Sequence, residues 1–492
     1  MEKNRFSLLL EQLVNTAEVK HSLLAQELRF DVSYISKWVN GRVLPSEKTI
    51  EETVDKISES LVKHASNGGL AQLMRDYQVT REDALQAAIY QNLMAEYQYV
   101  IKSQQEQESI VAQKVSFYPC LSMEEFLKKI HHPVLRRVKD LDIMAAMDLF
   151  SIENEYRIRM VSQGFDTTAI TYDYPDVHFC LLIDQEKMRE DIIRNTLFVS
   201  NMLRMLSHVD FRFYGGKFAT GKLLFLVKNE LAVSGFLIRP DACASVAVCE
   251  GSENTQALYN CIQALCTRAA LLFQKLDIMD VLVNSTDYVH SMLAPGRNWL
   301  LGHVTEHLLP ADLFQQLAMN SRLAVQNYSV EDMLRLHKLA ESVLSKPTIR
   351  ILISELAISR FVITGEVDFF TEIQVLNYAQ RIRTLKYFLE RIRTIKAPIK
   401  IIHTPLMPDF EYNVMPSLFL SDTLSILRLK SINQEENLLL KINRKEMQQV
   451  HREFVDTLWN QEDHVASDVG ILERFICQQL QSLQILADTM ED

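Results

Sequence analysis

Two histidines near the middle of the chain have a spacing that could do chemistry. His303 and His307 flank Glu306 in the pattern His-x-x-Glu-His. Two histidines four residues apart on a helix can hold one zinc ion, and a glutamate between them can act as a general base. A catalytic zinc also needs a third protein ligand, and no supporting motif accompanies this segment. We therefore expect an amphipathic helix with partly exposed histidines and no metal.

A second segment, residues 216–222, follows most of the phosphate-binding P-loop pattern. A P-loop continues with a Ser or Thr that holds magnesium, and then with a helix whose N-terminus faces the phosphates. Leu223 takes the place of that hydroxyl residue, and a strand-like apolar run follows it. The pattern therefore favours a hairpin loop that exposes two lysines, Lys217 and Lys222.

Residues 381–400 are strongly basic for an acidic chain, with seven Lys and Arg residues against Glu390 alone. A solvated helix face explains this pattern, and so does a surface that binds anions or makes auxiliary contacts with DNA. Together with the two lysines, this stretch gives the candidate anion or effector contacts, which are Lys217, Lys222, Arg381 and Arg391.

The chain shows no Ser-His-Asp spacing, nucleophile elbow or dinucleotide fingerprint. We therefore predict that the protein is not an enzyme, has no catalytic residues, and uses no metal or other cofactor.

Length and composition bound the class of protein. A chain of 492 residues predicts two to four domains, and its net charge of −11 means that any nucleic-acid contact must come from a local patch. The seven cysteines are scattered and form no CxxC pair, which is typical of a reduced, cytosolic protein. No apolar signal region or run near the ~18 residues of a membrane span is present. We expect a soluble cytoplasmic protein without membrane contact.

The N-terminal region contains two short helical patterns joined by a tight turn, over residues 24–41. Apolar residues at helical spacing give the two helices their buried sides, formed by Leu24, Ala25, Leu28, Ile35 and Trp38. Asp31 is placed to cap the second helix, and Gly41 to end it at a positive φ. This is the sequence pattern of a helix-turn-helix, whose second helix fits the major groove of DNA.

The stretch resembles the lambda-repressor/Cro type of helix-turn-helix, also called the Xre type, over roughly residues 5–62. The matching positions are Leu24, Ala25, Leu28, Asp31, Ser33, Ile35, Ser36, Trp38, Gly41, Leu44, Pro45 and Ser46. One position departs from the family, because Arg29 stands where the turn usually has glycine and would have to adopt a left-handed conformation or reshape the turn. An ordinary helical hairpin is the alternative.

The resemblance implies a transcriptional regulator of bacterial or phage type that binds double-stranded operator DNA. The candidate base contacts on the exposed side of the second helix are Ser33, Tyr34, Ser36 and Lys37. The candidate phosphate contacts flank that helix and are Ser22, Asn40 and Arg42. Residues 1–64 hold nine Lys and Arg against ten Asp and Glu, so we expect a homodimer in which two half-site contacts add.

The rest of the chain predicts a multidomain fold, with an all-α helix-turn-helix domain, a helical connector and an α/β (α+β) body of two similar lobes. Gly68-Gly69 marks the first boundary, and helices are expected over residues 121–149, 254–276 and 370–395. Apolar runs at residues 177–183 and 358–363 predict strands of the two lobes. The predicted domains are 1–66 (helix-turn-helix), 67–150 (helical connector or dimerisation), 151–290 (first lobe), 291–346 (helical linker) and 347–492 (second lobe with a C-terminal helix).

This body is similar to phospholipase-D-like folds, which pair two such lobes about a shared cleft. Catalysis in that family needs a His-x-Lys motif with a downstream Asp in each lobe, and the comparable places, residues 229–234 and 412–417, lack it. The resemblance implies lobes that sense an effector, a small molecule or a protein, or that set the dimer geometry. Two alternatives stay open: an enzyme with a regulatory DNA-binding head, and a protein-interaction module of a defence or phage-immunity system.

Overall fold

The computed structural model describes most of the chain, in two compact units. The described residues are 3–77, 79–108, 115–130, 135, 141–164, 177–207, 209–284, 287–326, 328–395, 397–403, 406–407, 414–430, 437–466 and 469–491. The first unit comprises Met1–Ile183, His208–Phe211 and Phe218–Arg268, and the second comprises Asp184–Ser207, Arg212–Lys217 and Ala269–Asp492. Within the described residues, no helix is long and apolar enough to cross a membrane.

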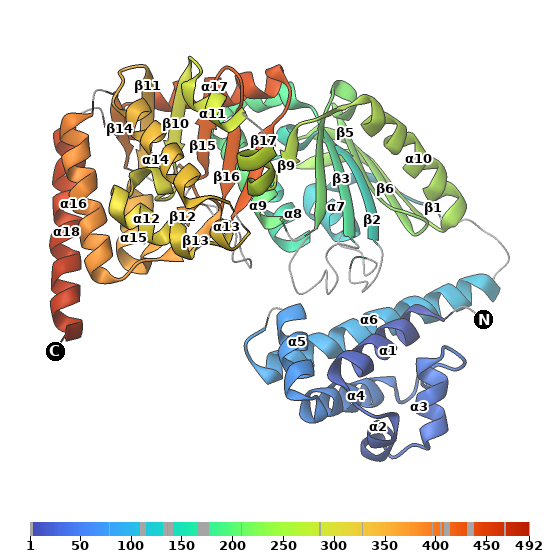
Figure 1. Ribbon diagram of the computed structural model, residues 1–492. Coiled ribbons are helices and arrows are strands. Elements are labelled where there is room, and N and C mark those ends of the chain that lie inside the picture. Colours follow the sequence, from blue (N-terminus) through green and yellow to red (C-terminus); the bar gives the residue numbers. More distant parts are fainter. Residues whose placement is uncertain are drawn as a thin grey trace. The chain divides into compact units, whose positions relative to one another are not determined.

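The first unit begins with helices that share one hydrophobic core, which extends from Phe6 to Val100. The helices are α1 (Arg5–Ala17), α2 (His21–Leu28), α3 (Val32–Val39), α4 (Ile50–His64), α5 (Asn67–Asp76) and α6 (Glu82–Glu108). Helix α6 packs along α1 and α4 (Figure 1). The predicted break at Gly68-Gly69 is wrong, because both glycines lie in the first turn of α5, which Ser66 caps through the amide of Gly69.

The described residues form two mixed sheets of eight strands each. The first has the order β1-β7-β6-β5-β2-β3-β4-β8. Its strands are β1 (Val115–Ser122), β2 (Leu141–Met147), β3 (Val177–Ile183), β4 (Asp210–Gly215), β5 (Lys222–Val227), β6 (Leu231–Arg239), β7 (Ala242–Glu250) and β8 (Ala270–Leu271). Strands β2 and β3 are parallel, while β2–β5, β5–β6, β6–β7 and β7–β1 are antiparallel. Helix α7 (Met123–Ile130) packs on β1 and β7, and α10 (Ser252–Arg268) packs on β2, β5, β6 and β7.

The second sheet has the order β18-β14-β11-β10-β15-β16-β17-β9. Its strands are β9 (Phe273–Lys275), β10 (Arg297–Leu301), β11 (Ile349–Ser354), β14 (Ile399–Ile402), β15 (Ser417–Leu420), β16 (Ile426–Leu429), β17 (Leu438–Ile442) and β18 (Val465–Ala466). Strands β10, β11 and β14 are parallel, while β10–β15, β15–β16, β16–β17 and β17–β9 are antiparallel. A separate hairpin is formed by β12 (Glu366–Phe369) and β13 (Glu372–Val375).

Helices complete the second unit. They include α9 (Ile192–Met205), α11 (Asp287–Leu293), α12 (Ala311–Asn320), α14 (Val330–Leu344), α15 (Glu355–Thr364), α16 (Tyr378–Thr394), α17 (Lys445–Trp459) and α18 (Val469–Glu491). Helix α16 packs against α18, and α9 packs against α17. The sheet and these helices enclose a large apolar core that includes Trp299, Phe314 and Phe361.

Several predicted elements have the wrong type. The predicted strand at residues 358–363 lies in α15, whose buried positions Ala357, Ile358, Phe361 and Val362 follow helical spacing, and Gly365 ends it at φ +73°. The predicted helix over 121–149 contains β2, and the predicted helical linker 291–346 contains β10. Buried parallel strands have continuous apolar sequences, which periodicity alone does not distinguish from buried helices.

Two predicted helix ends are also wrong. Helix α10 stops at Arg268, so Leu271 and Phe273, which fall within the helix predicted over residues 254–276, lie in β8 and β9. The helix predicted over residues 370–395 begins only at Tyr378, where Asn377 and Gln380 form a capping box, and β13 precedes it.

The two neighbouring glycines of α5 allow a matched test of its packing. A Cβ at Gly69 would lie 2.4 Å from the carbonyl oxygen of Thr16 in α1, whereas a Cβ at Gly68 would have Ser66 Oγ as its nearest atom, at 4.0 Å. We expect Gly69→Ala to lower the free energy of unfolding by about 1–3 kcal/mol through overpacking. Gly68→Ala should raise it by up to about 1 kcal/mol through helix propensity. Urea denaturation measures both, and equal effects of the two changes would contradict this packing.

Candidate nucleic-acid interface

Helices α2 and α3 are joined by the three residues Arg29, Phe30 and Asp31. Arg29 adopts the left-handed conformation that the sequence required, with φ 60° and ψ 37°. Its amide and that of Phe30 donate to the last carbonyls of α2, at 3.2 Å to Gln26 and 3.0 Å to Ala25. The carboxylate of Asp31 then accepts a 2.8 Å hydrogen bond from the amide of Ser33, which caps α3. The predicted capping role of Asp31 is confirmed.

The buried side of α3 fixes its orientation on the helical core. Ile35 and Trp38 are buried, and the ring of Trp38 meets that of Phe30 edge-on at 5.1 Å between centroids. Asn40 Nδ2 donates to the carbonyl oxygen of Ser36 at 2.8 Å, and Gly41 follows at φ +72°. The start and end of α3 are therefore both set by local hydrogen bonds, as the sequence pattern predicts.

The predicted base-contact residues lie mainly on the exposed side of α3. Ser33, Tyr34 and Lys37 are exposed, and Ser36 is half-buried, with its Oγ accepting a bond from Asn40. Tyr34 is 47% exposed, and the ammonium of Lys37 lies 5.3 Å from the centre of its ring. The structure thus brings a hydroxyl, a phenol and a cation together on one face, which suits contact with base edges and phosphates.

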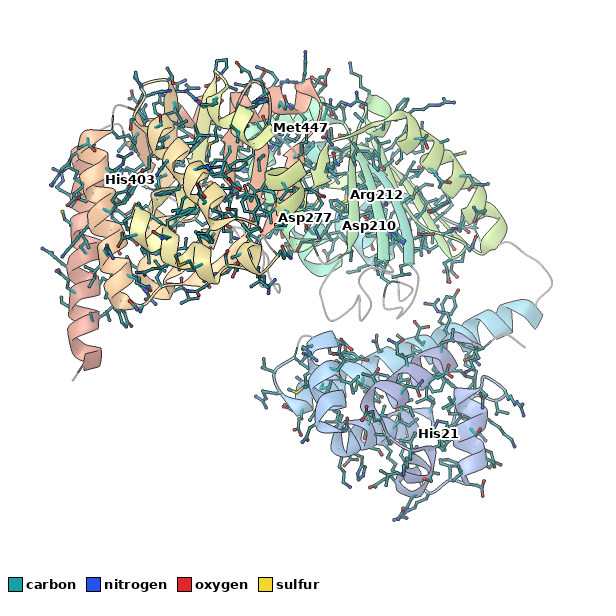
Figure 2. All side chains as sticks on the ribbon, in the orientation of Figure 1. His21, Asp210, Arg212, Asp277, His403 and Met447 are labelled. Atoms are coloured by element: carbon teal, nitrogen blue, oxygen red, sulfur yellow. The ribbon has the colours of Figure 1, made fainter. Side chains whose placement is uncertain are left out.

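The predicted phosphate-contact residues are exposed at the ends of the two helices. Ser22 lies in the first turn of α2, beside His21, which Figure 2 labels. Asn40 and Arg42 lie just after α3. Within the described residues, Lys37 and Arg42 form no ion pair, so both cations are available to an external anion.

Charge in this region is unevenly distributed despite its near-zero total. An open depression of about 610 Å³ between α4 and α6 is lined by the acidic residues Glu51, Glu52, Asp55 and Asp83. Hydrogen bonds from Ser33, and more weakly the charge of Lys37, lower the pKa of Asp31, so this exposed carboxylate is ionised beside α3. Any DNA contact by α3 is therefore local, since Asp31 precedes it and acidic residues line the depression between α4 and α6.

No family model matches the chain, and no curated protein matches it either.

The P-loop-like segment connects β4 to β5, and because β2 and β3 lie between these two strands in the sheet, the predicted hairpin is wrong. It leads into β5 and not into a helix, and the amide of Gly221 donates to Asp148 Oδ2 at 2.6 Å, in the role that a phosphate would have in a P-loop. Lys222 Nζ donates to the carbonyl oxygen of Phe218 at 3.0 Å, and Lys217 is exposed.

The two predicted anion contacts of α16 have different surroundings. The Arg381 guanidinium is buried and donates to four backbone carbonyls, those of Val362, Ile363, Thr364 and Leu376. It therefore closes the C-terminal end of α15, and the prediction of an anion contact is wrong for this residue. Arg391 is half-buried, and its Nη2 donates to the carbonyl oxygen of Glu341 at 3.4 Å.

The His-x-x-Glu-His segment belongs to a buried network of charges. Glu306 and His307 are buried in a short 3-10 helix, Glu306–Leu308, so the predicted amphipathic helix with partly exposed histidines is wrong. Both oxygens of Glu306 accept hydrogen bonds from Arg428, at 2.8 and 2.9 Å. His303 Nε2 lies 3.0 Å from Asp368 Oδ2. Among the described residues, no group of three or more His, Cys, Asp and Glu side chains could hold a metal.

Opposite charges keep this network ionised although it is buried. Burial alone would raise the pKa of Glu306 and of Asp368, but the charge of Arg428, the neighbouring histidines and the hydrogen bonds together outweigh it, so both are lowered, that of Asp368 to about 2. Burial lowers the pKa of His307 to about 4, which keeps this imidazole neutral. Arg428 and Asp368 are far from Glu306 in the sequence, and no local pattern could have identified them.

The turn position offers one test of the α2–α3 geometry. Arg29→Gly should raise the free energy of unfolding by up to about 1 kcal/mol, because glycine adopts a left-handed conformation without a Cβ clash. Arg29→Ala also removes the charge but keeps the Cβ, so it should stay near the wild-type value. Urea denaturation of both variants compares them, and indistinguishable stabilities would argue against a left-handed Arg29.

The buried network offers a second test. Arg428→Met leaves Glu306 and Asp368 without their cation and should lower the free energy of unfolding by about 3–5 kcal/mol. Arg335→Met, which breaks exposed pairs with Glu331 and Asp332, should cost less than about 1 kcal/mol. A loss at Arg428 as small as that at Arg335, measured by thermal and urea unfolding, would contradict the burial of this ion pair.

Proposed function

We propose that the protein is a sequence-specific DNA-binding transcriptional regulator of the Xre type, in which α3 enters the major groove. The observation that carries this proposal is the exposed face of α3, where Ser33, Tyr34 and Lys37 lie together on a helix capped at both ends. The turn supports it further, because Arg29 adopts the conformation that the family's turn glycine would have.

A homodimer suits this region better than a monomer. Acidic side chains on α4 and α6 repel DNA, so each copy offers only a small cationic patch around Lys37 and Arg42. Two copies on a two-fold symmetric operator would double the base and phosphate contacts without a larger patch.

We further propose that the body consists of two similar lobes and regulates the head. The two sheets support this, because their strands have the same order of neighbours. Counted along the chain, the strands β1 to β8 correspond in turn to β9, β10, β11, β14, β15, β16, β17 and β18. In both sheets a parallel pair, β2–β3 or β10–β11, adjoins an antiparallel series. In this correspondence β3 matches β11, whereas the sequence pattern predicted the matching strand at residues 358–363.

The alternative of an enzyme has less support. Its best sequence signal was the His-x-x-Glu-His segment, and the side chains of that segment are engaged by Arg428 and Asp368. Among the described residues, no specific contact favours the alternative of a protein-interaction module.

The test uses the full-length protein and sheared DNA from the genome that encodes it. Fragments that the protein retains are sequenced, and the shared site is placed in a short labelled duplex. At fixed salt, Lys37→Ala combined with Ser33→Ala should weaken binding to this duplex by at least about 100-fold, since each lost base contact costs about 1–3 kcal/mol in each half-site.

Lys56→Ala is the matched control, because it removes the same charge from the exposed face of α4. This variant should bind as the wild type does. The proposal fails if the wild-type protein retains no fragment more tightly than random duplex, or if the double variant binds like the control.

A further inference from the structure

A charged contact within the first unit links its helices to its sheet. Arg5 is the first residue of α1, and its side chain is only 8% exposed. Its Nη2 donates to Glu96 Oε1 of α6 at 3.2 Å, and its Nη1 donates at 3.0 Å to Glu230 Oε2, in the turn between β5 and β6. Helices α1 to α6, which we call the head, therefore meet the sheet through a buried guanidinium.

Two carboxylates compensate the unfavourable position of Arg5. A cation at the N-terminus of a helix faces the positive end of the helix dipole, and burial removes it from water. The side chains of Glu96 and Glu230 are 3% and 9% exposed, so both acids are buried together with the guanidinium. Glu96 belongs to the head and Glu230 to the sheet. The compensation of Arg5 therefore uses both sides of the contact.

Tyr99 of α6 adds a second bond from the head to Glu230. Its hydroxyl donates to Glu230 Oε2 at 2.6 Å, and the guanidinium of Arg5 lies 3.8 Å from the centre of its ring. Burial, and then the charge of Glu230, raise the pKa of Tyr99 to about 12, so the phenol keeps its proton and remains a donor. Two residues of the head, one from α1 and one from α6, thus hold the same carboxylate oxygen.

The turn between β5 and β6 fixes Glu230 from the side of the sheet. Asn229 adopts a left-handed conformation there, at φ 62°. The amide and the ammonium of Lys228 donate to the carbonyl and the carboxylate of Asp142, at 3.0 and 2.9 Å. The amide of Gly251 donates to the carbonyl oxygen of Glu230 at 3.3 Å. The turn is thus tied to the start of β2 and to the end of β7, so a shift of either strand would move Glu230.

The contact is polar, and each side of it keeps its own core. The apolar core of the head extends from Phe6 to Val100 and includes no described residue of the sheet. Opening the contact would therefore bring charged groups into water and leave both cores intact. A buried ion pair contributes little net stability, because the loss of hydration offsets the attraction between the charges. The closed and open states of this contact therefore differ little in free energy.

We propose that Arg5, Glu96, Tyr99 and Glu230 form a latch that restrains the head on the sheet and releases it as one folded body. With the latch closed, the head and the sheet move together. With the latch open, the head moves separately and carries α3 with it. An event that shifts β2 or β7 would reach the head through Glu230. The latch does not depend on the proposed DNA binding, and its test contains no DNA.

The experiment measures how fast the head tumbles within the full-length protein. The chain has three tryptophans, of which Trp38 lies in the head, and Trp299 and Trp459 lie in the second unit. Labelling tryptophan with ¹⁵N gives one indole signal for each of them. Trp38 and Trp299 are both buried, so the nuclear relaxation of each indole reports the rotational correlation time of the body around it. The quantity compared between variants is the ratio of the Trp38 value to the Trp299 value.

Three variants decide whether this contact restrains the head. Glu230→Ala leaves Arg5 paired with Glu96, so the head should stay folded. Loss of the charge-assisted bonds should shift the closed–open equilibrium by about tenfold or more toward the open state, and the ratio should fall. Tyr99→Phe removes one hydrogen bond and should lower the ratio less. Glu153→Ala is the matched control, because it removes an exposed carboxylate of the first unit outside the latch, and it should leave the ratio unchanged.

The position of the Trp38 signal separates release of the head from its unfolding. A wild-type position together with a lower ratio in Glu230→Ala supports the latch. A ratio in Glu230→Ala equal to that of the Glu153→Ala control would overturn the proposal. A Trp38 signal at the position of an unfolded chain would also overturn it, because Glu230 would then support the fold of the head and not its attachment.

Discussion

The second unit depends on one buried guanidinium. Arg428 of β16 pairs with Glu306, 122 residues earlier in the chain, and lies 3.6 Å from Asp368 of β12. All three side chains are almost completely buried, and buried charges persist only when they are paired and hydrogen-bonded. The pairing therefore fixes where the segment after β10 and the β12–β13 hairpin lie against the sheet. It also helps to keep Asp368 ionised, and this carboxylate lies 3.0 Å from His303 Nε2.

The N-terminal helices were predictable because their signals are local. Asp31 and Gly41 sit at the ends of α3, and the spacing of Ile35 and Trp38 identifies its buried face. In the body, strands such as β2 and β10 are buried almost throughout, so their sequences lack the alternation that identifies a strand. Helix α15 shows the opposite error, because its run of apolar residues was predicted to be a strand. The helical spacing of its buried residues and the position of Gly365 at its end indicate a helix.

The same difference separates the α3 face from the buried charge network of the second unit. The residues of the α3 face are consecutive, so the sequence identified them together with the turn that positions them. The basic residues of α16 show how composition alone misleads, because Arg381 is the most buried of its candidate anion contacts and caps the carbonyls of α15. The groups of the buried network are spread from His303 to Arg428, and only the tertiary fold brings them together.

The proposed correspondence between the two sheets sets apart one segment of the second unit. Between β3 and β4 the described chain contains the short 3-10 helix Gln185–Asp191 and α9, whereas between β11 and β14 it contains α15, the β12–β13 hairpin and α16. The hairpin supplies Asp368 to the buried network. In the proposed repeat, this part of the network therefore lies on an insertion into the second copy. An insertion can acquire charged groups without disturbing the shared sheet, provided that a partner such as Arg428 neutralises the carboxylates it buries.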